Sequence, residues 1–272
     1  MLIDEFSYAS KGNSLPRNLT IRAVELISGQ PQLKRIYTDY QAENLPHDRF
    51  WQEVIERLHL DVRLHGEAPA HIPKTGPLVV VANHPYGVLD GIAICWLVAQ
   101  IRQDFKILIN NVLCRAPEMK EHVLPVDFDE TPEALETNLA SRQQARHLLQ
   151  AGGVVIVFPA GAISTTPRFM ARRAQEIAWA PLVAQLIRKT KADVLPVYFD
   201  GQNSLLFQLA SHVSYAMRVA LIFREVRRRM GSRLDMVIGQ TLPYAQLHGH
   251  LPPKNLAHYL QNHVDALRRF LP

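Results

Sequence analysis

The sequence predicts an α/β fold in which helices cover a mainly parallel or mixed central sheet and an N-terminal helical segment precedes it. Two observations support this prediction. From about residue 60 onward, short apolar runs alternate with segments whose apolar residues recur at helical spacing. Several runs, such as those at residues 78–82 and 154–158, are apolar at every position, which is typical of strands buried on both faces of a parallel sheet.

The first 58 residues are expected to form amphipathic helices. Apolar residues recur there at helical spacing: Leu19, Ala23, Leu26 and Ile27. Pro31 separates them from a second helical segment, and a third helix is expected at residues 47–58. The change of pattern that follows predicts an N-terminal helical segment, 1–58, and a larger domain, 59–272.

The larger domain is expected to alternate strands with helices. Strands are expected at residues 61–64, 77–82, 105–109, 123–128, 154–158, 194–199 and 234–238. Helices are expected at residues 91–101, 132–150, 175–189, 205–230 and 255–270. Thr131 is a suitable N-cap for the helix that follows it, and Gly152 and Gly153 end that helix. This alternation predicts a sheet with helices on both faces.

Composition restricts the class of protein. A spanning helix needs about 20 consecutive apolar residues, and the longest candidate, residues 77–101, is interrupted by polar residues, glycine and proline. Residues 1–14 lack the apolar core of a targeting signal, so none is expected. Two cysteines, Cys95 and Cys114, favour a reducing compartment. The net charge of +5 suits nucleic acid, anionic lipid or an acidic cofactor.

One segment combines a histidine and an aspartate directly after a buried-type strand: Asn83-His84-Pro85-Tyr86-Gly87-Val88-Leu89-Asp90. Reactive groups of open α/β sheets gather at the carboxyl ends of the strands. His84 can take a proton from an acceptor hydroxyl there, and Asp90 can hold its tautomer and stabilise the imidazolium. The alternative is structural: Asp90 caps the next helix, and His84 forms hydrogen bonds within a turn.

Two further segments also begin as apolar strands and end in polar loops. Residues 154–166 read Val-Val-Ile-Val-Phe-Pro-Ala-Gly-Ala-Ile-Ser-Thr-Thr, and residues 194–204 read Val-Leu-Pro-Val-Tyr-Phe-Asp-Gly-Gln-Asn-Ser. Backbone N–H groups and hydroxyls in the first loop can bind an anion or a developing oxyanion. An ordinary turn is the alternative for both segments, and it is favoured for most of the second.

In this order and at these separations, the three segments resemble the lysophospholipid acyltransferase superfamily, of the 1-acylglycerol-3-phosphate acyltransferase type. The similarity extends over about residues 60–238. That family has Asn-His followed by Asp, then Phe-Pro-Glu-Gly, then a strand with Pro-Val. The Asn-His-Pro and Phe-Pro-Ala-Gly of this chain are closest to the branch called hemolysin-like or ornithine-lipid acyltransferase.

The departures from the wider family concern charge and spacing. Five residues separate His84 from Asp90 instead of four, as expected for that branch, and the motif glutamate is Ala160. The motif arginine is Ile163, whereas Ser164 matches. The arginine of the second family motif has no clear counterpart near residues 123–129. Because bidentate arginine contacts hold phosphate best, these losses argue against lysophosphatidic acid as the acceptor.

The resemblance implies acyl transfer from a thioester of coenzyme A or acyl carrier protein to the hydroxyl of a lyso-lipid, either a lyso-ornithine-type lipid or a lysophospholipid. His84 would be the general base and Asp90 would orient it. The residues that would bind substrate are Asn83, Phe158, Pro159, Ala160, Gly161, Ser164 and Arg168. The resemblance implies no metal and no tightly bound cofactor.

The expected partners are a lipid acceptor, a membrane surface and acyl carrier protein as one donor carrier, with the protein peripheral on the inner face of the cytoplasmic membrane. The densest basic cluster is Arg224, Arg227, Arg228, Arg229 and Arg233. The cluster suits anionic lipid headgroups. The alternative is that its positive charges stabilise a helix C-terminus and keep the protein soluble. The amphipathic N-terminal helices could lie in the interface. Nucleic acid is not expected because no aromatic-interleaved basic strand or reading helix accompanies the cluster.

Two rival functions remain. The same His84 and Asp90 could activate water, giving a thioesterase or lipase, although the chain has no Gly-x-Ser-x-Gly elbow. Alternatively, the chain could bind lipid without catalysis. No phosphate-binding loop or dinucleotide fingerprint is present in the sequence.

Overall fold

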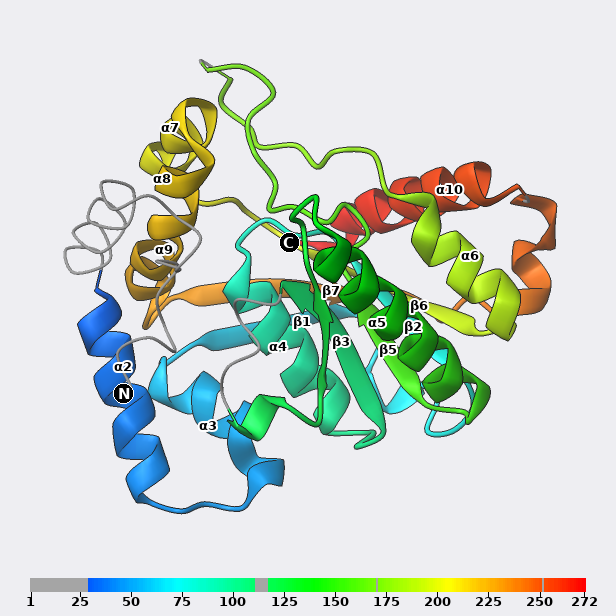
Figure 1. The fold of residues 1–272 in the computed structure, drawn as a ribbon, viewed down its shortest axis with the longest axis horizontal. Coiled ribbons are helices and arrows are strands. Elements are labelled where there is room, and N and C mark those ends of the chain that lie inside the picture. Colours follow the sequence, from blue (N-terminus) through cyan, green and yellow to red (C-terminus); the bar gives the residue numbers. More distant parts are fainter. Residues whose placement is uncertain (1–28, 111–116, 170, 251) are drawn as a thin grey trace.

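The computed structural model describes residues 29–110, 117–169, 171–250 and 252–272 (Figure 1). Its centre is a seven-stranded sheet in the order β1-β7-β6-β2-β5-β3-β4. The strands are β1 (Asp61–Gly66), β2 (Leu78–Ala82), β3 (Phe105–Asn110), β4 (Val123–Val126), β5 (Val154–Val157), β6 (Asp193–Phe199) and β7 (Arg233–Ile238). Every strand overlaps a predicted one, because the apolar runs that predicted them are the strands of the core.

The sheet is mixed and mainly parallel, as predicted. Strands β4, β3, β5, β2 and β6 pair in parallel, β6 pairs with β7 in the antiparallel sense, and β1 pairs with β7 in parallel. The carboxyl ends of β2, β5 and β6 therefore lie side by side at one edge of the sheet. The loops of the three motif segments all begin at this edge.

Helices surround the sheet in chain order: α2 (Gln30–Ala42), α3 (Phe50–Arg57), α4 (Val88–Ala99), α5 (Pro132–Gln150), α6 (Pro181–Thr190), α7 (Leu205–Val213), α8 (Tyr215–Ala220), α9 (Ile222–Arg229) and α10 (Pro253–Ala266). Short 3-10 turns lie at His47–Arg49, Pro69–His71, Pro117–Met119, Tyr244–His250 and Leu267–Phe270. Within the described ranges, no helix is both long and apolar enough to cross a membrane.

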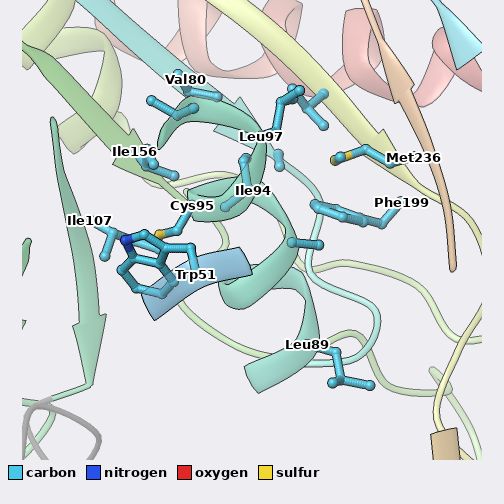
Figure 2. Close-up of a cluster of buried hydrophobic side chains, with 14 of the residues drawn as sticks. Trp51, Val80, Leu89, Ile94, Cys95, Leu97, Ile107, Ile156, Phe199 and Met236 are labelled. Carbon is cyan, nitrogen blue, oxygen red and sulfur yellow. The ribbon is translucent and has the colours of Figure 1, made fainter. Parts of the chain in front are cut away.

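Two apolar cores lie on opposite faces of the sheet. Successive strand residues point to opposite faces, so Val80 of β2 packs with α3, α4 and α9, whereas Val79 and Val81 pack with α5, α6 and α10. Figure 2 shows the first core, where Trp51 of α3 and Cys95 of α4 lie beside Ile107 of β3. Burial on both faces explains why β2 is apolar at every position.

The N-terminal helical segment is present as α2 and α3. The predicted helix around Leu19–Ile27 lies outside the described residues. Phe50, Trp51 and Ile55 of α3 are buried in the same core as the sheet. The division of the chain at residue 58 stays a prediction.

The helix predicted at residues 175–189 is wrong at its start. Gln175 instead pairs with Thr165 in an isolated antiparallel bridge. Ala180 is extended and α6 begins at Pro181, because the residue before a proline is driven out of the helical region. The chain between β5 and α6 therefore runs as a long loop that rises above the sheet (Figure 1).

Candidate active site

The turn between β2 and α4 carries His84 and Asp90. Gly87 is the N-cap of α4 with φ 83° and ψ −112°, a conformation that only glycine adopts readily. Oδ2 of Asp90 accepts the backbone N–H groups of Tyr86 at 2.8 Å and Gly87 at 2.9 Å. The capping interpretation of Asp90 is therefore confirmed, and α4 begins three residues earlier than the sequence predicts.

The cap does not exclude the catalytic interpretation, because the same oxygen also faces the histidine. Oδ2 of Asp90 lies 3.1 Å from Nδ1 of His84, an ion-pair distance without the alignment of a hydrogen bond. The Asp90 side chain is fully buried and its Oδ1 has no hydrogen-bond partner. Burial raises the pKa of Asp90, opposed by His84 and the two N–H groups. A carboxylate in this position stabilises positive charge on the adjacent ring.

The His84 ring is held on several sides and remains accessible. It stacks on Phe158 at the end of β5, with ring centroids 4.0 Å apart and planes 28° apart. Its backbone carbonyl accepts the N–H of Ser164 at 2.8 Å. Its side chain is 18% exposed. Since Nδ1 faces Asp90, the ring nitrogen that can take a proton from a substrate is Nε2.

Glu176 also belongs to the site, although it is not among the residues predicted from the sequence. Its Oε1 accepts the backbone N–H of His84 at 2.5 Å, and its Oε2 accepts Nε1–H of Trp179 at 2.6 Å. Burial raises the pKa of Glu176 to about 8, against the lowering effect of these hydrogen bonds, and nearby Asp265 and Asp90 raise it further. Only a contact across 92 residues of sequence brings this carboxyl to His84. The loss of the motif glutamate at Ala160 was the one available signal to look for a carboxylate elsewhere.

Comparison with known proteins identifies the family. A family model described as Acyltransferase matches residues 61–200, just over half of the 272-residue chain. The chain belongs to the acyltransferase family. This confirms the predicted enzyme class and the resemblance to the lysophospholipid acyltransferase superfamily.

Curated relatives and a solved structure agree with this acyltransferase assignment. A lyso-glycine lipid O-acyltransferase of Bacteroides thetaiotaomicron is 24% identical over 221 residues, covering 76% of each chain. A protein of the same name from Phocaeicola vulgatus is 21% identical over 220 residues, covering 76% of this chain and 74% of its own. The crystal structure of the 1-acyl-sn-glycerophosphate (LPA) acyltransferase PlsC from Thermotoga maritima shares the fold, with a TM-score of 0.55 at 15% identity, covering 93% of this chain and 97% of that one.

The acyltransferase fold uses Asn83 as a link between strands. Its Nδ2 donates to the carbonyl of Phe199 at 2.8 Å, and its Oδ1 accepts the N–H of Phe199 at 2.7 Å. The side chain is buried, and both ends of the amide are occupied by the end of β6. A substrate contact of Asn83 stays a prediction.

The other residues predicted to bind substrate are not all at the surface of the site. Phe158 and Ser164 lie against His84, and Gly161, with φ 69°, donates its N–H to the Phe158 carbonyl in a turn. Pro159 is buried, and Ala160 packs into the core beneath α5 and α6. Their roles in binding stay predictions.

Arg168 lies on an excursion of the long loop, residues 165–169 and 171–175, closed at its base by the Thr165–Gln175 bridge. Its side chain is exposed. The side chain of Gln202 ties the returning strand of the excursion, accepting the N–H of Ala174 at 2.7 Å and donating to the carbonyl of Arg172 at 3.1 Å. Arg168 thus lies on the exposed excursion, and its contact with substrate stays a prediction.

A second arginine reaches the site loop from α8. The Arg218 guanidinium donates to the carbonyl of Ile163 at 2.7 Å and lies over the ring of Phe207. Ile163 occupies the position of the motif arginine, and the Arg218 guanidinium binds its backbone carbonyl. The sequence did not indicate this, because 55 residues separate the two.

The arginine cluster of residues 224–233 is largely engaged by the protein itself. Arg224 pairs with the buried Glu225 at 3.1 Å, Arg229 lies over the ring of Tyr86, and Arg233 pairs with Asp235 at 2.6 Å.

Among the described residues, no group of three or more His, Cys, Asp or Glu side chains is arranged to hold a metal ion.

Proposed function

We propose that this acyltransferase transfers a fatty acyl group from an acyl thioester to the hydroxyl of a lyso-lipid, with His84 as general base and Asp90 as the residue that orients it. The observation that carries the proposal is the 3.1 Å separation of Nδ1 of His84 from a fully buried Asp90 carboxylate at the carboxyl ends of the strands. The donor is a thioester of coenzyme A or acyl carrier protein.

In the proposed reaction, one proton moves from the acceptor hydroxyl to His84 and then to the departing thiolate. Nε2 of His84 takes the proton of the acceptor hydroxyl as its oxygen attacks the thioester carbonyl carbon. Asp90 stabilises the imidazolium while the tetrahedral intermediate exists. The C–S bond then breaks, and the departing thiolate takes the proton from His84, giving an ester and a free thiol. The loop of residues 158–164 borders this position and would bind the headgroup or the oxyanion.

The acceptor we favour is a lyso-lipid with an amino-acid headgroup. The relatives are named for lyso-glycine lipid. The Asn-His-Pro and Phe-Pro-Ala-Gly motifs of this chain resemble those of the ornithine-lipid acyltransferase branch. Ile163 replaces the arginine that would bind a phosphate monoester. Because the proposed acceptor is a lipid, we also propose that the protein acts at a membrane, as a peripheral enzyme on the inner face of the cytoplasmic membrane.

The decisive assay supplies acyl-CoA and acyl carrier protein donors with a panel of lyso-lipids, including lyso-glycine lipid, lyso-ornithine lipid and lysophosphatidic acid, and detects diacyl products by mass. His84→Ala should lower kcat by about 10²–10⁴-fold. Asp90→Asn, which keeps an oxygen for the helix cap but removes the charge, should also lower kcat strongly. His71→Ala is the matched control, because this histidine is 69% exposed and remote from the turn.

Three outcomes would contradict the proposal. Near-full transferase activity of His84→Ala would exclude this histidine as the base. Free fatty acid released at the same rate without an acceptor would favour a thioesterase. Binding of lipid without turnover of any acceptor would favour a non-catalytic protein.

A further inference from the structure

Helix α7 exposes apolar side chains on the side that faces away from the sheet. Its Leu205 and Val213 are 67% and 68% exposed, and Leu206 is 46% exposed. Phe207 and Ala210, on its other side, are buried. An exposed apolar patch marks an interaction surface.

The excursion of the long loop extends this patch. Oγ1 of Thr166 lies 2.9 Å from Nε2 of His212, and the N–H of Thr166 donates to Gln208 of α7 at 2.9 Å. Phe169, which is 53% exposed, has its ring centroid 6.0 Å from that of His212. Two segments that lie far apart in the sequence thus form one surface. We call it the apolar face: Phe169, Leu205, Leu206 and Val213.

The apolar face is continuous with the candidate active site. The buried side of α7 packs on Val88 and Ile163. Ile163 in turn approaches Gly87 so closely that a Cβ on Gly87 would lie 2.6 Å from its Cδ1. The buried side of α7 therefore packs against the turn that holds His84 and Asp90.

Charge distinguishes this face from the exposed leucines of α5. Residues 159–175 contain three arginines and no acidic residue, and these arginines are exposed: Arg168, Arg172 and Arg173. Between residues 201 and 230 the only acidic side chain is Glu225, which is buried. On α5, by contrast, Leu135 and Leu139 are 58% and 54% exposed, but acidic residues surround them in the sequence: Asp127, Asp129, Glu130, Glu133 and Glu136. Anionic lipid would be attracted to the first patch and repelled by the second.

We propose that the apolar face is the membrane-docking surface of this enzyme and that it inserts into the headgroup region of an anionic bilayer. Docking there presents the acceptor lipid to His84 from the side of α7 and the excursion. Arg168, Arg172 and Arg173 contact the anionic headgroups. The side chains of the apolar face enter the membrane interface. This inference rests on the proposed lipid acceptor.

The test compares a charged variant of the apolar face with a matched variant of α5. Leu205→Glu/Val213→Glu should lower the partition coefficient on phosphatidylglycerol–phosphatidylcholine vesicles about tenfold or more, whereas Leu135→Glu/Leu139→Glu should bind as the wild type does. Arg172→Gln/Arg173→Gln should reduce the preference for these vesicles over pure phosphatidylcholine. Leu205→Ser/Val213→Ser, without added charge, should show a smaller loss in the same direction.

A second measurement separates docking from chemistry. Acylation of a short-chain lyso-lipid below its critical micelle concentration should be unchanged in Leu205→Glu/Val213→Glu, while acylation of a vesicle-borne acceptor should fall with the partition coefficient. If the wild type acylates neither acceptor, the proposed function fails, and the vesicle-binding comparison still decides the docking surface.

Three results would overturn the docking proposal. One is wild-type vesicle binding by Leu205→Glu/Val213→Glu. Another is a dimer that this variant converts to a monomer, which would assign the face to a second copy of the chain. The third is a large fall in melting temperature for both the Glu and the Ser variants, which would mean that the face is covered within the folded chain, for example by residues 1–28.

Discussion

Asp90 shows how one side chain can serve the helix and the histidine together. Its Oδ2 accepts two N–H groups at the start of α4 and lies 3.1 Å from Nδ1 of His84. The two N–H groups hold the carboxylate of Asp90 in place beside the His84 ring. The structural and the catalytic interpretations of Asp90 are therefore compatible with each other.

Removing the Glu176 carboxyl should disturb the position of His84 without weakening the binding of the acceptor. Its carboxyl holds the backbone of His84, so Glu176→Ala should displace the base. A displacement of this kind costs up to about 10²-fold, and it should lower kcat while the KM of the acceptor changes little. Glu176→Gln keeps an acceptor oxygen for the His84 N–H and should recover most of the loss. Glu136→Ala, at an exposed position of α5, is the control. Equal losses in the Ala and Gln variants would contradict this role.

The same carboxyl should also make stability depend on pH. Burial raises the pKa of Glu176 from 4.5 to about 8, so the folded protein keeps a proton that the unfolded chain releases. The stability due to this group is fully present below pH 4.5 and is lost as the pH rises through about 8. Urea unfolding of the wild type and Glu176→Gln across this range should give curves that diverge up to about pH 8 and run parallel above it. Parallel curves throughout would place Glu176 in solvent.

At the scale of elements, the strands could be predicted from the sequence and the long loop could not. A strand such as β5 is apolar at every position because both faces are buried, which is a local signal. The loop after it has no such signal. Gln175 is held by Thr165 and Ala174 by Gln202, and these contacts depend on the finished fold. Glu176 and Arg218 reach the site through similarly distant contacts, so a search along strand ends finds His84 and misses them.

Asn83 should act mainly on the stability of the sheet. Asn83→Asp replaces the donor that bonds the Phe199 carbonyl with an oxygen, leaving two acceptors face to face. A buried polar group left unsatisfied costs about 1–3 kcal/mol. Because Asn83 is buried, the free energy of unfolding should fall by that amount, and the urea midpoint should fall with it. Asn262→Asp, exposed on α10, should leave the midpoint unchanged. A raised KM with an unchanged midpoint would instead support the substrate contact predicted from the sequence.

Across the whole molecule, the two edges of the sheet have different tasks. The carboxyl edge gathers His84, Asp90, Phe158 and Glu176, where a buried carboxylate oxygen is left without a partner. At the amino edge, the buried guanidinium of Arg102 joins the starts of three adjacent strands. It donates to the carbonyls of Gly76 before β2 and Gly152 before β5, and to the carboxylate of Asp104 before β3. The Arg102 guanidinium thus has partners at the amino edge, whereas Oδ1 of Asp90 at the carboxyl edge has none.

This division predicts that stability and catalysis can be altered separately. Arg102→Met keeps the apolar stem but removes the charge-assisted hydrogen bonds. The loss of such a buried network should lower the free energy of unfolding by about 2–4 kcal/mol. Because the carboxyl edge is untouched, kcat and KM should match the wild type at a temperature where the variant is folded. Arg188→Met, exposed on α6, should change the free energy of unfolding by no more than about 0.5 kcal/mol. A fall in kcat of folded Arg102→Met would show instead that the amino edge sets the position of His84, through the length of β2.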